Sequence, residues 1–188
     1  MKEISLHILD ILQNSVEAGA TEILLYVDEN TEKDLLRIII KDNGRGMDEK
    51  LVKCVLDPFK TTRKTRRVGL GLSLFQMTAR QCEGDLTIAS ALGKGTRVNV
   101  VMKYGHWDRP PLGNMADTII SFLMGSPSID LKYIHKKDNS KITFKTKEVK
   151  EMLEDEAPFE NSKVAYMVKG YLEQELSKLY GGEINGEA

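Results

Sequence analysis

The chain has 188 residues, enough for one ordinary domain and a smaller one, and its 41% hydrophobic and 29% charged residues are typical of a globular protein. The formal net charge of −1 excludes a global attraction to nucleic acid or to an anionic membrane, so such binding would need a local patch. No apolar run approaches the roughly 18 residues of a membrane span, and the N-terminus lacks a signal-peptide cleavage site. Cys54 and Cys82 match no metal-ligand spacing, which favours buried free thiols. We therefore expect a cytoplasmic protein without a membrane partner, and nucleic acid is disfavoured.

Helix and strand patterns are intermixed in residues 1–103. Apolar residues at three- and four-residue steps predict an amphipathic helix over residues 3–18, which Gly19 ends in a left-handed conformation. Runs rich in β-branched residues then predict strands, and the cation-rich segment 57–69 is typical of a loop. The predicted strands are 22–28, 35–42, 85–90 and 96–103, and the further helices are 48–56 and 70–82. This order, with antiparallel neighbours, favours a two-layer α/β sandwich.

A linker is predicted at residues 104–114, where two prolines and two glycines interrupt the pattern. Residues 115–180 predict a small α+β accessory region, and the tail at 181–188 is expected to be flexible. The expected elements of the accessory region are a helix at 115–124, a β-hairpin formed by IDLKYIH and KITFKT, a helix at 147–155 capped by Thr146, and a helix at 162–180. A partner-docking module and a structural extension are both open interpretations, and the hairpin is suited to extending another sheet.

Three glycine-bearing segments lie in the first half, namely DNGRGM (42–47), VGLGLSL (68–74) and LGKGT (92–96). Glycine permits positive φ and close approach of a ligand to the backbone, which a nucleotide site needs. None of the three fits the phosphate loop GxxxxGK[ST] or follows a strand as GxGxxG does in dinucleotide-binding folds. A different nucleotide-binding arrangement is required.

Taken in order with DILQNSVEAGA (10–20) and DPFKTTR (57–63), these segments resemble the GHKL ATP-binding family. That family includes DNA gyrase B subunits, heat-shock chaperone ATPases, sensor histidine kinases and MutL-type mismatch-repair proteins. DILQNSVEAGA is similar to the family's N box, DPFKTTR to the segment before its ATP lid, and the glycine segments to its three glycine boxes. The likeness covers residues 1–103. It implies the Bergerat fold, an α+β sandwich with a mixed sheet and helices on one face, followed here by the small C-terminal extension.

The resemblance implies an adenine site around Asp42, whose carboxylate would accept a hydrogen bond from the exocyclic amine of adenine. Gly44 and Gly46 would let the backbone bend around the base, Met47 would cover it, and Thr96 would add a hydroxyl. By itself, Asp-Asn-Gly is equally typical of a simple turn. The surrounding boxes favour the adenine site.

The resemblance also implies a magnesium and phosphate site. Asn14 matches the family's magnesium-binding asparagine, and one side-chain oxygen suffices because magnesium keeps several waters and binds phosphate oxygens. Gly69 and Gly71, with Leu70 and Leu72 of the same box, would present backbone N–H groups to the phosphates at the start of the helix. The lid contributes Lys60 and Arg63 as candidate catalytic cations for the γ-phosphate, while most of its cations fit a solvated loop.

Asp10 is the candidate catalytic base. Hydrolytic members of the family carry a glutamate four residues before the magnesium asparagine, and sensor histidine kinases usually carry a second asparagine there. Aspartate keeps the carboxylate but is one methylene shorter. The second glycine box also departs from the kinase pattern, because Arg67-Val68 precedes Gly69.

The resemblance implies several possible functions that use ATP and Mg²⁺. The N box begins within a few residues of Met1, so we expect no upstream phospho-accepting helical domain, and we interpret His7 as structural. Stand-alone domains of this kind resemble anti-sigma-factor kinases, which phosphorylate a partner protein on serine or threonine. The favoured function is therefore a histidine-kinase-like protein kinase that transfers the γ-phosphate to a partner protein. Its alternatives are a slow ATPase acting as a conformational switch and a degenerate ATP sensor, and a homodimer stays possible.

Overall fold

Six strands form one mixed sheet, in the order β3-β4-β2-β1-β5-β6. The computed structural model describes residues 2–56 and 70–181 of the chain. The strands are β1 (Glu22–Asn30), β2 (Leu35–Asp42), β3 (Asp85–Ala91), β4 (Gly95–Lys103), β5 (Asp130–Lys137) and β6 (Ser140–Lys145). All neighbours are antiparallel except β1 and β5, which run parallel in the register Glu22↔Asp130 to Glu29↔Lys137. The parallel pair requires a long crossover, which the chain makes through β2, β3, β4 and the three described helices that lie between β2 and β5 in the chain.

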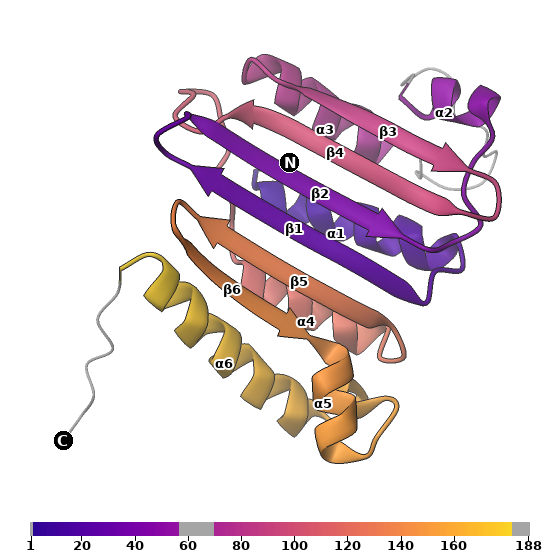
Figure 1. Ribbon diagram of the computed structural model, residues 1–188, viewed down its shortest axis with the longest axis vertical. Helices are drawn as coiled ribbons and strands as arrows, with labels where there is room; N and C mark the ends of the chain where they lie inside the picture. The colour runs from indigo at the N-terminus through magenta and orange to yellow at the C-terminus, as the bar shows by residue number, and fades with distance from the viewer. Residues whose placement is uncertain (1, 57–69, 182–188) are drawn as a thin grey trace.

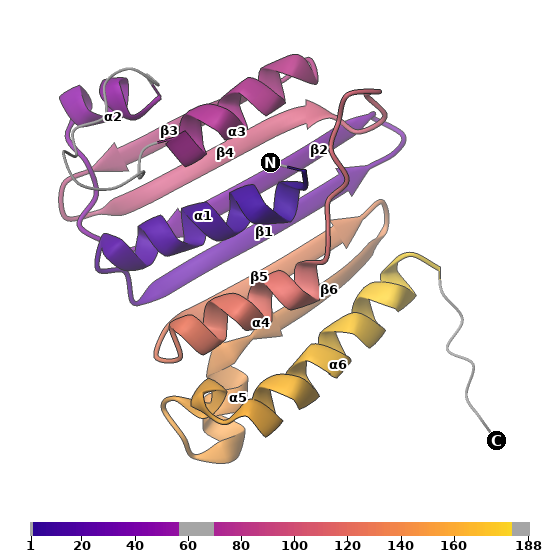
Figure 2. The same cartoon turned by 180° about the vertical axis from the view of Figure 1, so that it is seen from behind.

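The described helices leave one side of the sheet uncovered (Figures 1 and 2). They are α1 (Ile4–Glu17), α2 (Glu49–Val55), α3 (Leu70–Gln81), α4 (Met115–Gly125), α5 (Thr146–Leu153) and α6 (Ser162–Leu179), with a 3₁₀ turn η1 (Pro158–Glu160). Helices α1, α3 and α4 lie behind the sheet in Figure 1 and in front of it in Figure 2. Strand side chains alternate between a buried position toward these helices and a more exposed position on the other face. None of the described helices is both long and apolar enough to span a membrane.

The sequence patterns predicted the helices α1 to α6 and the strands β1 to β6 to within two residues at each end, whereas the 3₁₀ turn η1 was not predicted. The predicted two-layer α/β sandwich with a mixed sheet and helices on one face is confirmed. One local prediction is wrong, because the cap position of α5 is Lys145, which makes no side-chain cap bond. The Thr146 hydroxyl is buried instead, donates to the Ile129 carbonyl and accepts a hydrogen bond from the Leu131 backbone N–H at 2.8 Å. It joins α5 to the start of β5.

The C-terminal hairpin β5–β6 extends the same sheet whose strands adjoin the first and third glycine boxes. Strand β5 pairs with β1 along the full length of β5. The predicted linker at residues 104–114, which would divide the chain into two domains, stays a prediction. Strands that precede this segment and strands that follow it share one hydrogen-bonded sheet.

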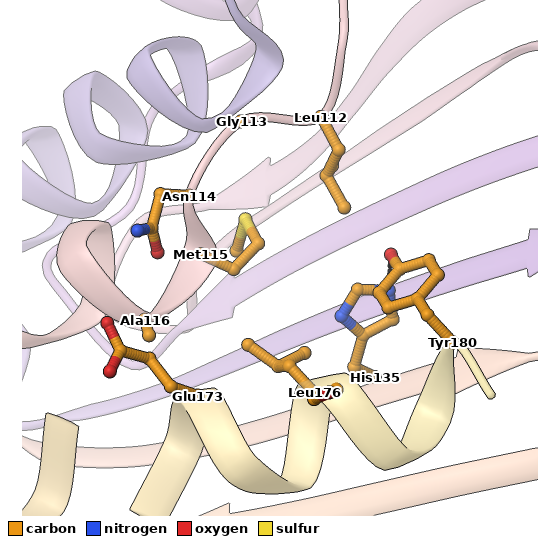
Figure 3. A pocket seen from close by; sticks show the side chains of 10 residues that line it. Leu112, Gly113, Asn114, Met115, Ala116, His135, Glu173, Leu176 and Tyr180 are labelled. Carbon is orange, nitrogen blue, oxygen red and sulfur yellow. Dashed lines mark hydrogen bonds between the residues drawn. The ribbon is translucent and has the colours of Figure 1, made fainter. Parts of the chain in front are cut away.

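A buried polar cluster fastens the C-terminal end of α6 to the sheet. The Glu29 carboxylate is 3% exposed, lies 2.8 Å from His135 Nε2, and accepts a hydrogen bond from the Tyr180 hydroxyl. The other His135 ring nitrogen lies 2.6 Å from the Tyr133 hydroxyl, so both nitrogens have partners. His135 and Tyr180 line one end of a hollow of about 300 Å³ between α4 and α6 (Figure 3). Burial alone would raise the pKa of Glu29, but the hydrogen bonds from His135 and Tyr180 outweigh it and lower that pKa.

The cluster makes the stability of the protein depend on pH in a predictable direction. The folded-state pKa of Glu29 lies below its usual value of 4.5, so its charged form stabilises the fold fully above about pH 4.5. This contribution is lost as the pH falls from 4.5 through the folded-state pKa. We expect Glu29→Gln to lower the free energy of unfolding by about 2 kcal/mol at neutral pH. Urea unfolding of the variant and the wild type near pH 7 and about pH 3.5 measures the difference, which should shrink at the lower pH.

Glu22→Gln, on the exposed face of the same strand, is the matched control and should change stability little at either pH. A loss in Glu29→Gln that is the same at both pH values would contradict the charged role of Glu29.

Candidate functional site

The end of α1 is joined to the first glycine segment by backbone hydrogen bonds. Gly19 has φ of +77°, which ends the helix and turns the chain toward β1. The Ala18 carbonyl that the helix leaves free accepts a hydrogen bond from the Arg45 N–H at 2.9 Å. The Ala18-Gly19-Ala20 turn therefore holds the loop after β2 against the helix that carries Asp10 and Asn14.

The carboxylate of Asp42 lies at the end of β2 and is only 7% exposed. Its Oδ1 accepts hydrogen bonds from the backbone N–H groups of Gly44 (2.9 Å) and Thr96 (3.2 Å). Its Oδ2 accepts one from the Ser15 hydroxyl at 3.1 Å. A carboxylate offers about four acceptor positions, so Oδ2 has capacity for a further donor such as an amine. Three chain segments thus fix the orientation of one acceptor.

Two serines of this cluster were not found by sequence reasoning. Ser15 lies four residues after Ile11 on the apolar stripe of α1 and is 3% exposed. A polar residue on a stripe that is otherwise apolar could have indicated its role from the sequence. Ser90 continues the inward alternation of Leu86 and Ile88 in β3 in the same way. Its hydroxyl accepts a hydrogen bond from the Met47 N–H (2.8 Å), donates to the Gly95 carbonyl (3.0 Å), and lies 2.9 Å from the Thr96 hydroxyl.

Glycine is needed in the first glycine segment because backbone meets backbone there. A Cβ atom on Gly46, which has φ of +67°, would lie 2.0 Å from the Ala91 carbonyl oxygen. A Cβ atom on Gly44 would lie 2.9 Å from the Ala18 carbonyl oxygen and 3.1 Å from Asp42 Oδ1. Larger residues would therefore push the loop away from α1 and from the turn between β3 and β4. The space beside Asp42 is kept free of side chains at these two positions.

Asp10 and Asn14 lie one helical turn apart on α1, both half-buried. Neither side chain forms a hydrogen bond or ion pair with another residue in the described parts of the chain. Burial raises the pKa of Asp10. A Cβ atom on Gly71 would lie 3.1 Å from Asp10 Oδ2, so the carboxylate is next to the first turn of α3. The two side chains are hard oxygen donors free to bind a ligand beside a helix N-terminus.

His7, one turn before Asp10, packs into the core. It is 1% exposed and its ring stacks on Phe75 of α3, with centroids 4.6 Å apart and an interplanar angle of 7°. Neither ring nitrogen has a hydrogen-bond partner among residues 2–56 and 70–181. Burial lowers the pKa of His7 to about 4, so the ring is neutral at pH 7. The contact fixes the spacing between α1 and α3.

The structure brings together the predicted adenine residues Asp42, Gly44, Gly46, Met47 and Thr96 around the Ser90 hydroxyl and the Asp42 carboxylate. Leu72 is half-buried near the start of α3, which begins at Leu70. Lys60, Arg63 and Gly69 lie outside the described residues. Within residues 2–56 and 70–181, three or more His, Cys, Asp or Glu side chains nowhere form a group able to hold a metal.

The donors present fit Mg-ATP. Magnesium takes few protein ligands when phosphate oxygens complete its shell, so the Asn14 amide oxygen alone would suffice as the protein ligand. The oriented Asp42 carboxylate suits an amine on a planar base, which the glycine loop can approach closely. The residues can thus bind both ends of the nucleotide.

Comparison with known proteins identifies the family of this chain. The family model described as "Histidine kinase-, DNA gyrase B-, and HSP90-like ATPase" matches residues 2–106, more than half of the chain. A putative sensor protein of Shewanella frigidimarina is 32% identical over 103 residues, covering 54% of this chain and 16% of that protein. The tetrathionate sensor histidine kinase TtrS of Salmonella typhimurium is 40% identical over 79 residues, covering 42% of this chain and 13% of TtrS.

Among solved structures, the N-terminal domain of a DNA repair protein aligns with a TM-score of 0.55 at 15% identity, covering 76% of this chain and 52% of that one. This likeness supports the fold alone. The chain spans less than one fifth of the length of the two sensor proteins. The matched family model covers the N box and all three glycine boxes, and the chain therefore belongs to the family of histidine kinase-, DNA gyrase B- and HSP90-like ATPases.

Proposed function

We propose that the protein binds Mg-ATP and transfers the γ-phosphate to a hydroxyl group of a partner protein in the cytoplasm. The observation that carries the nucleotide part is the Asp42 carboxylate, which is buried and held by three donors with acceptor capacity left over. The two relatives include a sensor histidine kinase, which supports phosphotransfer as the chemistry.

In this proposal, one end of the site binds adenine and the other end binds the phosphates and magnesium. Asp42 accepts the exocyclic amine of adenine, and the loop with Gly44 and Gly46 lies against the base, with Met47 and Thr96 beside it. Asn14 would hold magnesium, which supplies charge neutralisation between the phosphates. The first turn of α3, at Gly71 and Leu72, presents backbone N–H groups to the phosphate oxygens.

Asp10 is the proposed base. Its carboxylate, next to Gly71, takes the proton from the acceptor hydroxyl as that oxygen bonds to the γ-phosphorus, and ADP leaves with the electrons of the broken P–O bond. The raised pKa of Asp10 makes the carboxylate a stronger base than an exposed aspartate. Lys60 and Arg63 are proposed to contact the transferring group. If water occupies the acceptor position, the same carboxylate supports slow hydrolysis, which is the alternative function.

The adenine contact is tested by Asp42→Asn. The asparagine oxygen can still accept from Gly44 and Thr96, so the loop should keep its fold, while its NH₂ group cannot accept the adenine amine. We expect ATP affinity measured by calorimetry to fall at least about tenfold, and Asp42→Ala to abolish measurable binding.

Asp138→Asn, the same chemical change in the turn between β5 and β6, should leave ATP affinity unchanged. Unaltered affinity in both Asp42 variants would overturn the nucleotide-site assignment.

Phosphotransfer is tested by incubating the protein with γ-labelled ATP and host-cell lysate. A labelled protein band supports the kinase, and its alkali lability is expected because a hydroxyl-linked phosphoserine is lost in base. Asp10→Asn should keep ATP affinity and lower the transfer rate on the order of a hundredfold. Label found only as free phosphate would favour the slow ATPase. Wild-type transfer by Asp10→Asn would show that Asp10 is not the base.

A further inference from the structure

The uncovered side of the sheet carries most of the strand cations. In Figure 1 this side faces the viewer, and the described helices α1, α3 and α4 lie behind it. Alternation along the strands assigns its residues, and we call this side the open face. Its cations are Arg37, Lys41, Arg97, Lys103, Lys132, Lys136, Lys141 and Lys145, and its acids are Glu22, Asp28, Asp85 and Asp130. The net charge of −1 therefore conceals a local positive patch.

Like charges lie directly opposite one another on this face. The strand register pairs Lys132 with Lys145 and Lys136 with Lys141 across β5 and β6. It also pairs Lys41 with Arg97 across β2 and β4. Opposed like charges destabilise a sheet, so their presence calls for a compensating anion.

The available acids neutralise only part of the patch. Lys136 lies 3.8 Å from Asp28 and Lys145 lies 2.5 Å from Glu148. In the described chain, Lys41, Lys132 and Lys141 form no ion pair, and all three are exposed. The β5–β6 hairpin thus presents unpaired ammonium groups to solvent.

An acidic segment follows the hairpin directly. Residues 148–160 include six exposed carboxylates, at Glu148, Glu151, Glu154, Asp155, Glu156 and Glu160. The lysine of this segment, Lys150, is buried and bonds Asp130 and the Ser128 carbonyl. The contact between Lys145 and Glu148 places the acidic segment against the edge of the basic hairpin. Met152, between these acids, is 82% exposed.

We propose that the basic hairpin face and the acidic segment together form a two-fold interface with a second copy of this chain. A two-fold axis along the boundary between a basic and an acidic half brings each half onto the opposite half of the partner, so the patch is complementary to itself. The basic halves gain carboxylates, the acidic halves gain ammonium groups, and the exposed Met152 is covered. The acidic segment would repel nucleic acid or an anionic membrane approaching the same region, which favours a second copy over a polyanion.

The interface lies away from the nucleotide site. Asp42 and Thr96 occupy the strand positions that face the helices, whereas the open face uses the alternate positions of the same strands. The proposal does not rest on phosphotransfer or on ATP binding. Self-association is expected with or without nucleotide.

Sedimentation equilibrium of the full chain tests the proposed dimer. The protein is measured between about 10 µM and about 500 µM, at about 0.05 M and at about 0.5 M salt. We expect a monomer–dimer equilibrium that high salt weakens. The basic-reversed variant Lys132→Glu/Lys141→Glu and the acidic-reversed variant Glu151→Lys/Glu156→Lys should each raise the dimer dissociation constant at least about tenfold. Lys33→Glu, an exposed lysine in the turn between β1 and β2, is the matched control and should dimerise as the wild type does.

Mixing the two reversed variants is the decisive step. The added acids of one variant then face the added lysines of the other, so the mixture should form a heterodimer that is tighter than the homodimer of either variant. ATP affinity reports that the variants are folded. A wild type that stays monomeric over this range, reversed variants that dimerise as the wild type does, or a mixture that stays monomeric would each overturn the proposal. Binding of a single-stranded oligonucleotide that requires Lys132 and Lys141 in a monomeric protein would overturn it in favour of nucleic acid.

Discussion

A buried carboxylate is costly unless donors surround it, and Asp42 meets this requirement with donors from three separate parts of the chain. Ser15 comes from α1, Gly44 from the loop after β2, and Thr96 from β4. The donors hold Asp42 in one orientation, and Asp42 in turn holds the helix, the loop and the strand together. The glycines and the turn at the end of α1 support the hydrogen bonds of Asp42, because they allow the backbones of these segments to approach closely.

The alternation of each strand divides the sheet into two surfaces with separate chemistry. On the helix side, β2 and β4 place Asp42 and Thr96 next to each other in the proposed nucleotide site. On the other side, the same strands contribute Lys41 and Arg97 to the open face. The two proposed binding surfaces therefore lie on opposite sides of one sheet, so a nucleotide on one side would not block a protein on the other. The parallel pairing of β1 with β5 adds the charged hairpin to this common scaffold.

Local patterns predicted the helices and strands and marked the candidate site residues, because helix periodicity, strand alternation and glycine spacing are local properties. Asp42, Gly44 and Gly46 came from one short segment, and the structure places them together. Ser15 and Ser90 were missed because their role depends on contacts between distant segments, although each is a polar residue at a buried position of its element.

Contacts between residues far apart in the chain could not be predicted from local patterns. The alternation of IDLKYIH predicts a strand, but alternation cannot specify β1 as its neighbour. The cations of the open face are distributed between residues 37 and 145, so only the strand register shows that Lys132 faces Lys145. Thr146 looked like a cap because hydroxyl residues favour that position, whereas tertiary contacts with Ile129 and Leu131 engage its hydroxyl.

In the proposed site, the Asp42 carboxylate accepts a hydrogen bond from the exocyclic amine of adenine. Calorimetry with ATP and with inosine triphosphate tests it most directly, because the second nucleotide carries a carbonyl oxygen where adenine carries the amine. We expect inosine triphosphate to bind the wild type at least about tenfold more weakly than ATP, since the buried carboxylate then faces an acceptor instead of a donor. Equal affinity for the two nucleotides would contradict it.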